Sequence, residues 1–341
     1  MEMLYDIGGF AGKVLLVTMA LVVILVVLAN LLLRSRAASQ RHLEVESVND
    51  RFQAYADALH EMSSDPKQMK KELKARAKAE KQKRKEGVAQ PKVFVLNFDG
   101  DVKASAVEQL RDEITAVLTS AQNGDEVVVK VESTGGMVHT YGLAATQLLR
   151  IRAKGLKLTI CVDKVAASGG YMMACTADQL LAAPFAILGS IGVVAQVPNL
   201  HRVLKKHDVD YEEMTAGEYK RTISILGEIT EKGRQKFLSQ LEDTHTLFKN
   251  FVAEYRPQLN LSQIATGEYW YGKQALELKL CDRLQSSDDY LFSLHPERQI
   301  LELSLHHRKT LGEKLAENIS VLFERGLLTW RQKLHDDSIL R

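Results

Sequence analysis

Hydrophobic and polar positions follow two different periods in the central part of the chain. Four short apolar runs are typical of buried strands. They span 93–98, 126–131, 158–162 and 179–182. Segments that are predicted to be helical separate or follow these runs, at 104–120, 141–153, 169–175 and 231–256. Strands that alternate with helices in this way predict βαβ units and a largely parallel sheet, which is an α/β fold.

A longer apolar segment, 14–33, contains no charged residue. About 20 helical residues span roughly 30 Å of hydrocarbon, so the segment predicts a transmembrane anchor after an N-terminal tail, 1–13. The alternative is a cleaved signal peptide, which has an apolar region of about 7–15 residues after a basic start. Glu2 and Asp6 precede this segment and Lys13 is its only basic leader, which favours an uncleaved anchor.

Residues 34–90 are predicted to form a polar and strongly basic stalk, helical or disordered. Its densest part, 67–86, is rich in Lys and Ala and has no apolar face. Such a run could bind anionic lipid headgroups. Nucleic acid is not expected as a partner, because the run has no aromatic residue to stack on bases. Basic residues after an anchor favour a cytoplasmic location for the bulk of the chain.

The composition of the chain limits the kinds of site that it can contain. The 341 residues are 45% hydrophobic, which is enough for a sizeable core. The three cysteines, Cys161, Cys175 and Cys281, have no CxxC spacing. This argues against a disulfide framework and against a thiolate metal site. We expect no cofactor and no metal.

Three glycine-bearing turns follow predicted strands, at 132–137, 163–171 and 188–193. In the first, paired glycines let the backbone approach a ligand and point N–H groups at it, as an oxyanion hole requires. In the second, Ser168 lies between small residues where a strand turns into a helix, which suits a nucleophile although the GxSxG pattern is absent. The alternative interpretation of Ser168 is an N-cap serine.

A nucleophilic serine needs a base, and two kinds of residue are available. Three histidines, His139, His201 and His207, lie outside any compact glycine-rich context. The other candidate is Lys220. To accept a proton at neutral pH, a lysine must have its pKa lowered by about 3 units from about 10.4, through burial or a nearby positive charge. The residues alone leave this choice open.

Four motifs together resemble the S49 family of signal peptide peptidases in their order and spacing. They are S-T-G-G at 133–136, A-A-S-G-G-Y at 166–171, G-S-I-G-V at 189–193 and G-E-Y-K at 217–220. The resemblance implies that Ser168 is the nucleophile, Lys220 the general base and Ser190 the residue that orients the lysine. The residues that match the family's oxyanion turn and the neighbour of its nucleophile are Gly135, Gly136 and Gly169.

The resemblance also implies the organisation of the chain. It predicts a ClpP/crotonase-like peptidase domain at 91–292, an amphipathic extension at 293–341, and a homo-oligomeric ring. One position departs from the family, because Lys279 stands where glycine is usual. The expected protein is a membrane-anchored serine endopeptidase of the bacterial inner membrane that cuts peptides or unfolded proteins, remnant signal peptides among them. Family members commonly work outside the cytoplasm, whereas the charge count favours the inside.

Alternative functions differ in their need for the serine. Acyl-CoA enzymes of the crotonase-like fold use a similar oxyanion hole without a serine at the position of Ser168. A non-catalytic membrane scaffold would use the basic stalk for binding.

In family members whose chain carries two such domains, serine and lysine come from different domains. This chain has one copy of each, about 50 residues apart, so we expect Lys220 of one subunit to serve Ser168 of the next.

Overall fold

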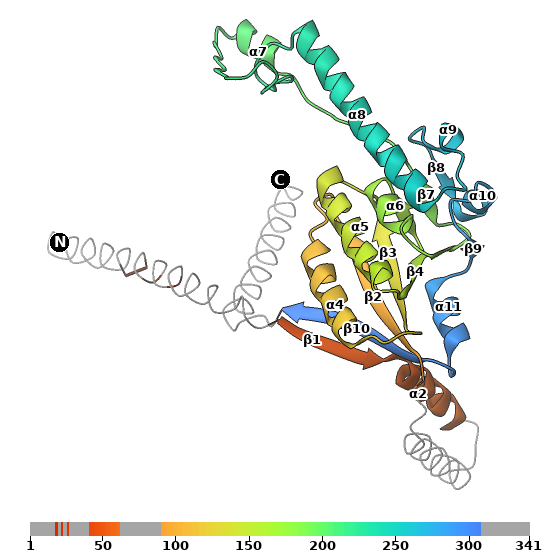
Figure 1. Ribbon diagram of the computed structural model, residues 1–341. Helices are drawn as coiled ribbons and strands as arrows, with labels where there is room; N and C mark the ends of the chain where they lie inside the picture. Colours follow the sequence, from red (N-terminus) through yellow and green to blue (C-terminus); the bar gives the residue numbers. More distant parts are fainter. Residues whose placement is uncertain (1–17, 20–21, 23–25, 27–40, 62–89, 308–341) are drawn as a thin grey trace, which may run out of the picture. The chain divides into compact units, whose positions relative to one another are not determined.

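The computed structural model describes residues 41–61 and 90–307, and the isolated positions 18, 19, 22 and 26. The chain divides into two compact units, 1–44 with 305–341 and 45–304. The second unit contains most of the sheet and the helices that cover it (Figure 1).

The central sheet is parallel, as predicted, in the order β10-β2-β3-β4-β6-β9. These strands are β2 (Lys92–Gly100), β3 (Glu126–Ser133), β4 (Lys157–Val162), β6 (Gln179–Ala182), β9 (Arg283–Leu284) and β10 (Gln299–His307). β1 (Arg41–Ser47) lies next to β10. The four strands predicted from the apolar runs are thereby confirmed, with small extensions at their ends.

A side branch of the sheet brings three strand ends together. β5 (Val165–Ala167) pairs with the end of β3 through Ala166 and Ser133. On its other side β5 runs parallel to β7 (Ile187–Gly189), which pairs in antiparallel fashion with β8 (Tyr269–Tyr271). The turns that follow β3, β5 and β7 are the three glycine-bearing turns of the sequence, so they meet at one edge.

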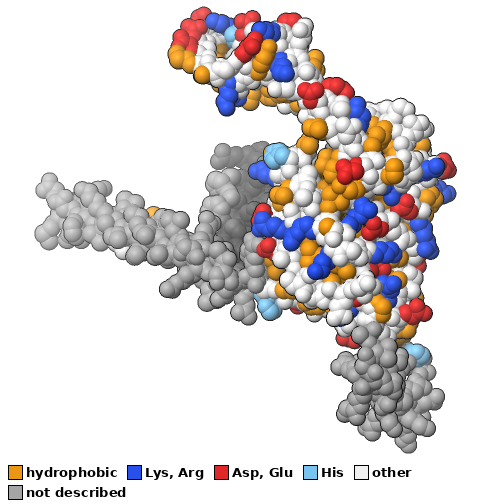
Figure 2. All heavy atoms as spheres, viewed as in Figure 1, with side chains coloured by type: hydrophobic (Ala, Val, Ile, Leu, Met, Phe, Trp, Pro, Cys, Tyr) orange, Lys and Arg blue, Asp and Glu red, His pale blue; other side chains and the backbone are white. Residues whose placement is uncertain are grey.

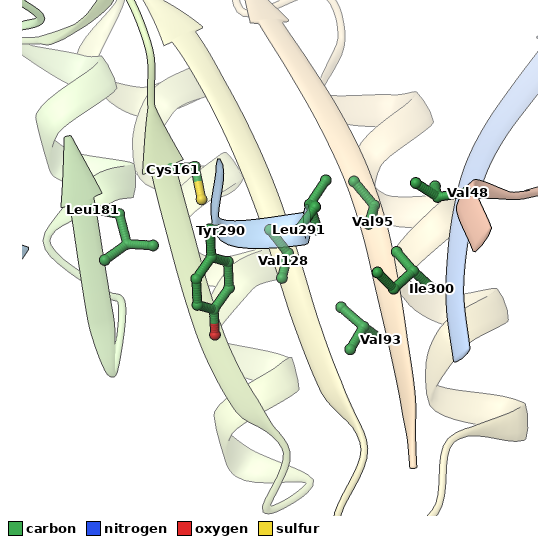
Figure 3. Packing of buried hydrophobic residues seen from close by; sticks show 9 residues of the cluster. All are labelled: Val48, Val93, Val95, Val128, Cys161, Leu181, Tyr290, Leu291 and Ile300. Carbon is green, nitrogen blue, oxygen red and sulfur yellow. The ribbon is translucent and has the colours of Figure 1, made fainter. Parts of the chain in front are cut away.

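Helices cover both faces of the sheet. α4 (Val107–Ser120), α5 (Val138–Ala153) and α6 (Gly169–Ala174) contact one another and β2, β3 and β4. On the other face, α2 (Val48–Glu61) and α11 (Ser287–Leu294) pack on a buried cluster (Figure 3). The cluster comprises Val48, Val93, Val95, Val128, Cys161, Leu181, Tyr290, Leu291 and Ile300. Burial on both faces is why these strands read as continuous apolar runs.

Two predicted helix starts were wrong. The helix expected at 141–153 begins three residues earlier, at Val138. The helix expected at 104–120 begins at Val107, because Ala104 has a left-handed φ of 50°. The carboxylate of Asp101 accepts the backbone N–H groups of Lys103 and Ser105 at 3.1 and 2.8 Å, which makes a local turn in place of the first helical turn.

Three elements, β1, α2 and β10, lie outside the predicted peptidase range, 91–292. Val48 of α2 is buried, and Ile300 of β10 pairs with Val93 of β2. Of the predicted anchor, 14–33, only four positions are described, and among all described residues no helix is long and apolar enough to cross a bilayer. The basic run 67–86 and the C-terminal tail beyond 307 lie outside the described residues.

A long excursion interrupts the domain after β7. It contains α7 (His201–Lys206) and the first two thirds of α8 (Glu231–Tyr255), and Figure 1 shows α7 at the end of α8 that points away from the sheet. None of residues 192–247 is buried, whereas Ile191 and Phe248 on either side are. We call 192–247 the arm, and 90–191 with 248–304 the body. The helix predicted at 231–256 is confirmed.

Candidate active site

The turn at Ser168 has an unusual backbone. Ser168 joins β5 to α6 with φ 52° and ψ −118°, outside the helical and extended regions. A non-glycine residue in such a conformation costs of order 1–3 kcal/mol and persists only where the surroundings enforce it. Here the Ser168 N–H donates to Gly189 O at 2.8 Å and the Met172 N–H donates to Ser168 O at 2.9 Å. A strained strand-to-helix turn is the geometry that exposes a serine nucleophile.

Glycines allow the neighbouring turn to pack directly on Ser168. A Cβ atom at Gly135 would lie 2.7 Å from Ser168 Cβ and 2.7 Å from Gly169 N, and Gly135 has a φ of +90°. A Cβ at Gly169 would lie 2.4 Å from the ring of Tyr141. Both contacts are far below van der Waals distance, so only glycine fits at either position. The first two glycine turns therefore lie directly against each other in the structure.

The N–H groups around Ser168 differ in availability. The Gly135 N–H donates to Ser133 Oγ at 3.1 Å, and the Met137 N–H donates to Val102 O at 2.9 Å. Within the described part of the chain, no acceptor is recorded for the N–H groups of Gly136 and Gly169. Gly169 is the first residue of α6, where helix N–H groups lack partners and favour negative charge. Of the three predicted oxyanion residues, Gly136 and Gly169 thus keep free donors.

Ser190 lies at the same edge as Ser168. Ala167 and Gly189 are register partners in β5 and β7, so Ser168 and Ser190 are the next residues on adjacent parallel strands. Ser190 is half-buried, has a φ of 51°, and donates its N–H to Glu268 O at 2.6 Å.

Lys220 lies on the arm and not at the serine. Its side chain is exposed, and no hydrogen bond or ion pair of its ammonium is recorded among the described residues. Its neighbours are held against α8: Glu218 pairs with Lys232, and the Tyr219 ring lies 5.9 Å from Lys232 Nζ. The structure does not bring Lys220 and Ser168 of one chain together, whereas it does bring Ser190 and Ser168 together.

The three candidate histidines lie on two different parts of the molecule. His139 is exposed in the first turn of α5, and His201 and His207 belong to the arm. In the described residues, none of these three side chains has a recorded hydrogen bond to Ser168.

Two buried hydroxyl groups near the site were missed from the sequence. Ser133 and Tyr141 bond to each other at 2.5 Å, beneath the turns that contain Gly135 and Gly169. Burial is the main cause of the raised pKa of Tyr141, and the negative charges of Asp101 and Asp99 raise this pKa further. The hydrogen bond with Ser133 lowers this pKa, but by less. The phenol therefore stays protonated and can donate. A tyrosine within a predicted apolar helix face was the only available signal, since buried tyrosines generally need a hydrogen-bond partner.

Comparisons with known proteins decide the family. Residues 2–148 match the profile described as Peptidase family S49 N-terminal, and 150–300 match Peptidase family S49. A probable protease SohB of Haemophilus influenzae is 46% identical over 327 residues, which cover 92% of this chain and 93% of the relative. The chain belongs to peptidase family S49. Another S49 relative, a probable protease SohB of Buchnera aphidicola subsp. Acyrthosiphon pisum, is 49% identical over 70% of each chain.

Membership of family S49 makes this chain a serine peptidase that acts on peptides, and the resemblance inferred from the four motifs is confirmed. A solved structure is also similar: a membrane-bound stomatin-specific protease mutant in complex with a substrate peptide. It has a TM-score of 0.39 and 15% sequence identity, and the match covers 68% of this chain and 99% of that one.

Proposed function

We propose that this S49 peptidase cuts peptide bonds with Ser168 as nucleophile and Lys220 of a neighbouring subunit as general base. The observation that carries the proposal is the contrast between the two residues. Ser168 sits in a strained turn beside two free N–H groups, while Lys220 is exposed on the arm and has no recorded partner among the described residues.

The chemistry is acyl transfer. Ser168 Oγ attacks the carbonyl carbon of the scissile bond as Lys220 Nζ accepts the hydroxyl proton, and the oxyanion accepts hydrogen bonds from the N–H groups of Gly136 and Gly169. The C–N bond then breaks and Lys220 returns the proton to the leaving amine. A water molecule loses a proton to Lys220 and attacks the ester carbonyl carbon. The bond to Ser168 Oγ then breaks, Lys220 returns the proton to that oxygen, and the acid product is released as its carboxylate.

Ser190 has a specific role in this proposal. It follows Gly189, whose carbonyl binds the Ser168 backbone, so a lysine that reaches Ser168 also comes within range of the Ser190 hydroxyl. Ser190 would accept a hydrogen bond from the ammonium and direct Nζ toward Ser168. We expect Ser190→Ala to lower activity less than Lys220→Ala, because it removes an orienting group and leaves the base.

Assembly supplies what one chain lacks. A lysine that serves as a base needs burial or a nearby positive charge, and the arm buries none of its residues. The arm also exposes large apolar side chains, and hydrophobic side chains are visible on its surface in Figure 2. Val194 and Met214 expose 81% and 89% of their surface. Packing of the arm on a second copy would cover these side chains and desolvate the lysine. The ClpP/crotonase-like fold and ring that the resemblance implies fit this arrangement.

Mixing two inactive chains tests the shared site. Ser168→Ala and Lys220→Ala chains are unfolded together, refolded at equal concentration, and assayed on an unfolded protein substrate. In a ring, about one interface in four combines an intact serine with an intact lysine, so about a quarter of wild-type activity should return. If mixed assemblies form, as shown by two different affinity tags, and stay inactive, the dyad is not shared between subunits.

The identity of the base has its own test. Lys220→Arg should be inactive, because a guanidinium does not give up its proton near neutral pH. An active Lys220→Arg enzyme would move the base to another residue, with His139 nearest to the serine turn in sequence.

We also propose that residues 14–33 anchor the enzyme in the bacterial inner membrane and that the stalk separates the anchor from the sheet domain. Remnant signal peptides and unfolded proteins are the proposed substrates. Carbonate extraction of membranes from cells that express the chain tests the anchor, since an anchored protein stays with the lipid. A C-terminal reporter fusion then shows which side of the membrane the body occupies.

A further inference from the structure

The active-site turns rest on a buried pair of hydroxyl groups. Ser133 is the last residue of β3 and is 3% exposed, and Tyr141, in the first turn of α5, is fully buried. Their oxygens are 2.5 Å apart, on the two sides of the turn 134–137. A buried polar pair is retained only where its hydrogen bonds are satisfied, so its remaining partners indicate what it holds in place.

Both hydroxyl groups bind backbone carbonyls where β2 ends, and Ser133 also binds the oxyanion turn. The Tyr141 hydroxyl donates to Asp101 O at 2.7 Å. The Ser133 hydroxyl therefore donates its proton, and its two acceptors are the Tyr141 hydroxyl oxygen and Gly100 O. Gly100 O lies 3.1 Å from Ser133 Oγ. Ser133 Oγ keeps a lone pair free, and it accepts the Gly135 N–H at 3.1 Å. Every bond of the network ends on the loop after β2 or on the oxyanion turn.

The bond to Gly135 sets the direction of the next peptide. With the Gly135 N–H turned toward Ser133 and the Met137 N–H bound to Val102 O at 2.9 Å, the intervening Gly136 N–H is left without a recorded acceptor among the described residues. The turn is thus fixed at two points around the one donor that the mechanism uses. Preorganised donors of this kind are effective because they need no reorganisation during the reaction.

Tyr141 contacts both turns at once. Its hydroxyl reaches Ser133 beneath the oxyanion turn. A Cβ atom added at Gly169 would lie 2.4 Å from Tyr141 Cγ, so the ring packs directly against Gly169. The ring is supported edge-on by Phe98, with centroids 6.3 Å apart. One rigid side chain therefore sets the spacing between the Gly136 and Gly169 donors.

We infer that Tyr141 and Ser133 are positioning residues that hold the two oxyanion donors at the spacing required by the tetrahedral intermediate. They do not touch the substrate and exchange no proton with it. The inference rests on the proposed function, because it assumes that Ser168 and the N–H groups of Gly136 and Gly169 perform the chemistry.

Tyr141→Phe is the sharpest test, because it keeps the ring against Gly169 and removes only the hydroxyl. Loss of one oxyanion donor costs about a hundredfold to a thousandfold in kcat, and misplacement of a donor should cost less. We expect kcat to fall about tenfold to a hundredfold while KM changes by less than about threefold. Ser133→Ala should behave alike, and the double variant should lose little more than either single variant, since both act through one network.

Tyr290→Phe is the matched control. Tyr290 is a buried tyrosine of α11 whose hydroxyl bonds to Glu126 Oε1 at 2.5 Å and to Lys157 Nζ at 3.1 Å, away from Ser168. Its loss should lower thermal stability as Tyr141→Phe does, and leave kcat per folded molecule unchanged. Circular dichroism gives the folded fraction of each full-length assembly at the assay temperature.

The outcomes separate the two proposals. A selective fall in kcat for Tyr141→Phe supports the positioning role. Wild-type kcat in folded Tyr141→Phe, or equal losses in Tyr141→Phe and Tyr290→Phe, overturns it. Ser168→Ala, assayed alongside, tests the proposed function independently. Full activity in that variant would show that Ser168 is not the nucleophile, whatever the result for Tyr141→Phe.

Discussion

The body and the arm of this chain satisfy their polar groups in different ways. In the body, the buried Glu126 carboxylate binds Lys157 at 3.0 Å, Arg298 at 3.1 Å and the hydroxyl of Tyr290 at 2.5 Å. In the arm, ion pairs such as Lys205 with Asp210 lie entirely at the surface. The body therefore derives its stability from interactions that water cannot replace, and the arm does not.

The two residues of the proposed dyad are divided in the same way, with Ser168 in the body and Lys220 in the arm. The serine turn is complete within one chain, because strained backbone is tolerated only where packing on all sides enforces it. The segment around Lys220 holds its shape through exposed contacts to α8, and solvent surrounds the lysine. Under the proposed function, a site assembled from both parts is inactive until another surface covers the arm. The four predictions below test this contrast with matched substitutions in the body and in the arm.

Arg256→Ala should have the largest effect. The Arg256 side chain is 4% exposed, binds Asp282 through both nitrogens at 2.9 and 2.7 Å, and donates to Lys279 O at 3.1 Å. Removing it leaves a carboxylate without its cation, which costs about 3–5 kcal/mol of unfolding free energy. Lys232→Ala removes the exposed partner of Glu218 and should leave urea unfolding unchanged. Similar losses in both variants would contradict the contrast.

The second comparison uses two glycines with positive φ, Gly135 in the body and Gly217 in the arm. A Cβ at Gly135 would meet Ser168 Cβ at 2.7 Å, whereas the nearest atom to a Cβ at Gly217 is Lys220 Cβ at 4.0 Å. Gly135→Ala adds steric overlap to backbone strain and should cost about 2–3 kcal/mol, with loss of peptidase activity. Gly217→Ala adds strain alone, about 1 kcal/mol. Urea midpoints of the two variants measure the difference.

The third comparison concerns pH and the carboxylates of Glu302 and Glu218. Burial alone would raise the pKa of Glu302, but the hydrogen bond from Asn97 and the charges of Lys130 and Arg51 lower it overall. A lowered pKa contributes stability above the unfolded-state pKa of about 4.3, and this contribution is lost as pH falls through the folded-state value. Glu302→Gln should therefore destabilise the protein by about 1 kcal/mol at pH 7 and by less near pH 3.

Glu218 provides the control in the arm. Its hydrogen bond with Lys232, and the charge of that lysine, lower its pKa as well, but both groups are fully exposed. Glu218→Gln should leave the thermal midpoint unchanged at either pH, because solvent screens the pair. An undiminished effect of Glu302→Gln at pH 3 would show that the shape of the side chain matters there, and not its charge.

The sequence predicted the body better than the arm, for a physical reason. Strands buried on both faces are largely apolar, so β2, β3 and β4 could be read directly from their apolar runs. The serine turn could be predicted because its packing leaves room only for small residues, and Gly135 and Gly169 show this in the sequence.

Other features depend on contacts that sequence patterns do not record. β10 joins the sheet through register with β2, and nothing in the local pattern of 299–307 shows where its partner lies. The start of α4 was misplaced because a side-chain turn at Asp101 competes with the helix. Ser133 and Tyr141 are separated by a loop, and their hydrogen bond exists only after folding. The position of Lys220 relative to Ser168 depends on the arm, which has no core to specify it.

The smallest effect is expected at two helix ends with the same backbone geometry. Lys279 follows α10 (Gly272–Glu277) with φ 63°, and Asp208 follows α7 with φ 55°. In both, the next residue donates its N–H to the carbonyl five residues earlier: Leu280 to Ala275 at 2.7 Å, and Val209 to Leu204 at 3.0 Å. This is the Schellman arrangement, in which glycine is preferred at the left-handed position.

Lys279→Gly should raise the unfolding free energy by up to about 1 kcal/mol, because relief of left-handed strain exceeds the backbone entropy that glycine adds. The gain should be transmitted to global unfolding, since Leu280 is fully buried and the Lys279 carbonyl binds Arg256. This strain would also explain why glycine is usual at the position of Lys279 in the family that the sequence resembles. Asp208→Gly should change the thermal midpoint less, because aspartate tolerates this conformation and Val209 is exposed. Equal gains at both positions would show that the arm unfolds together with the body, and the separation between the two regions would then be wrong.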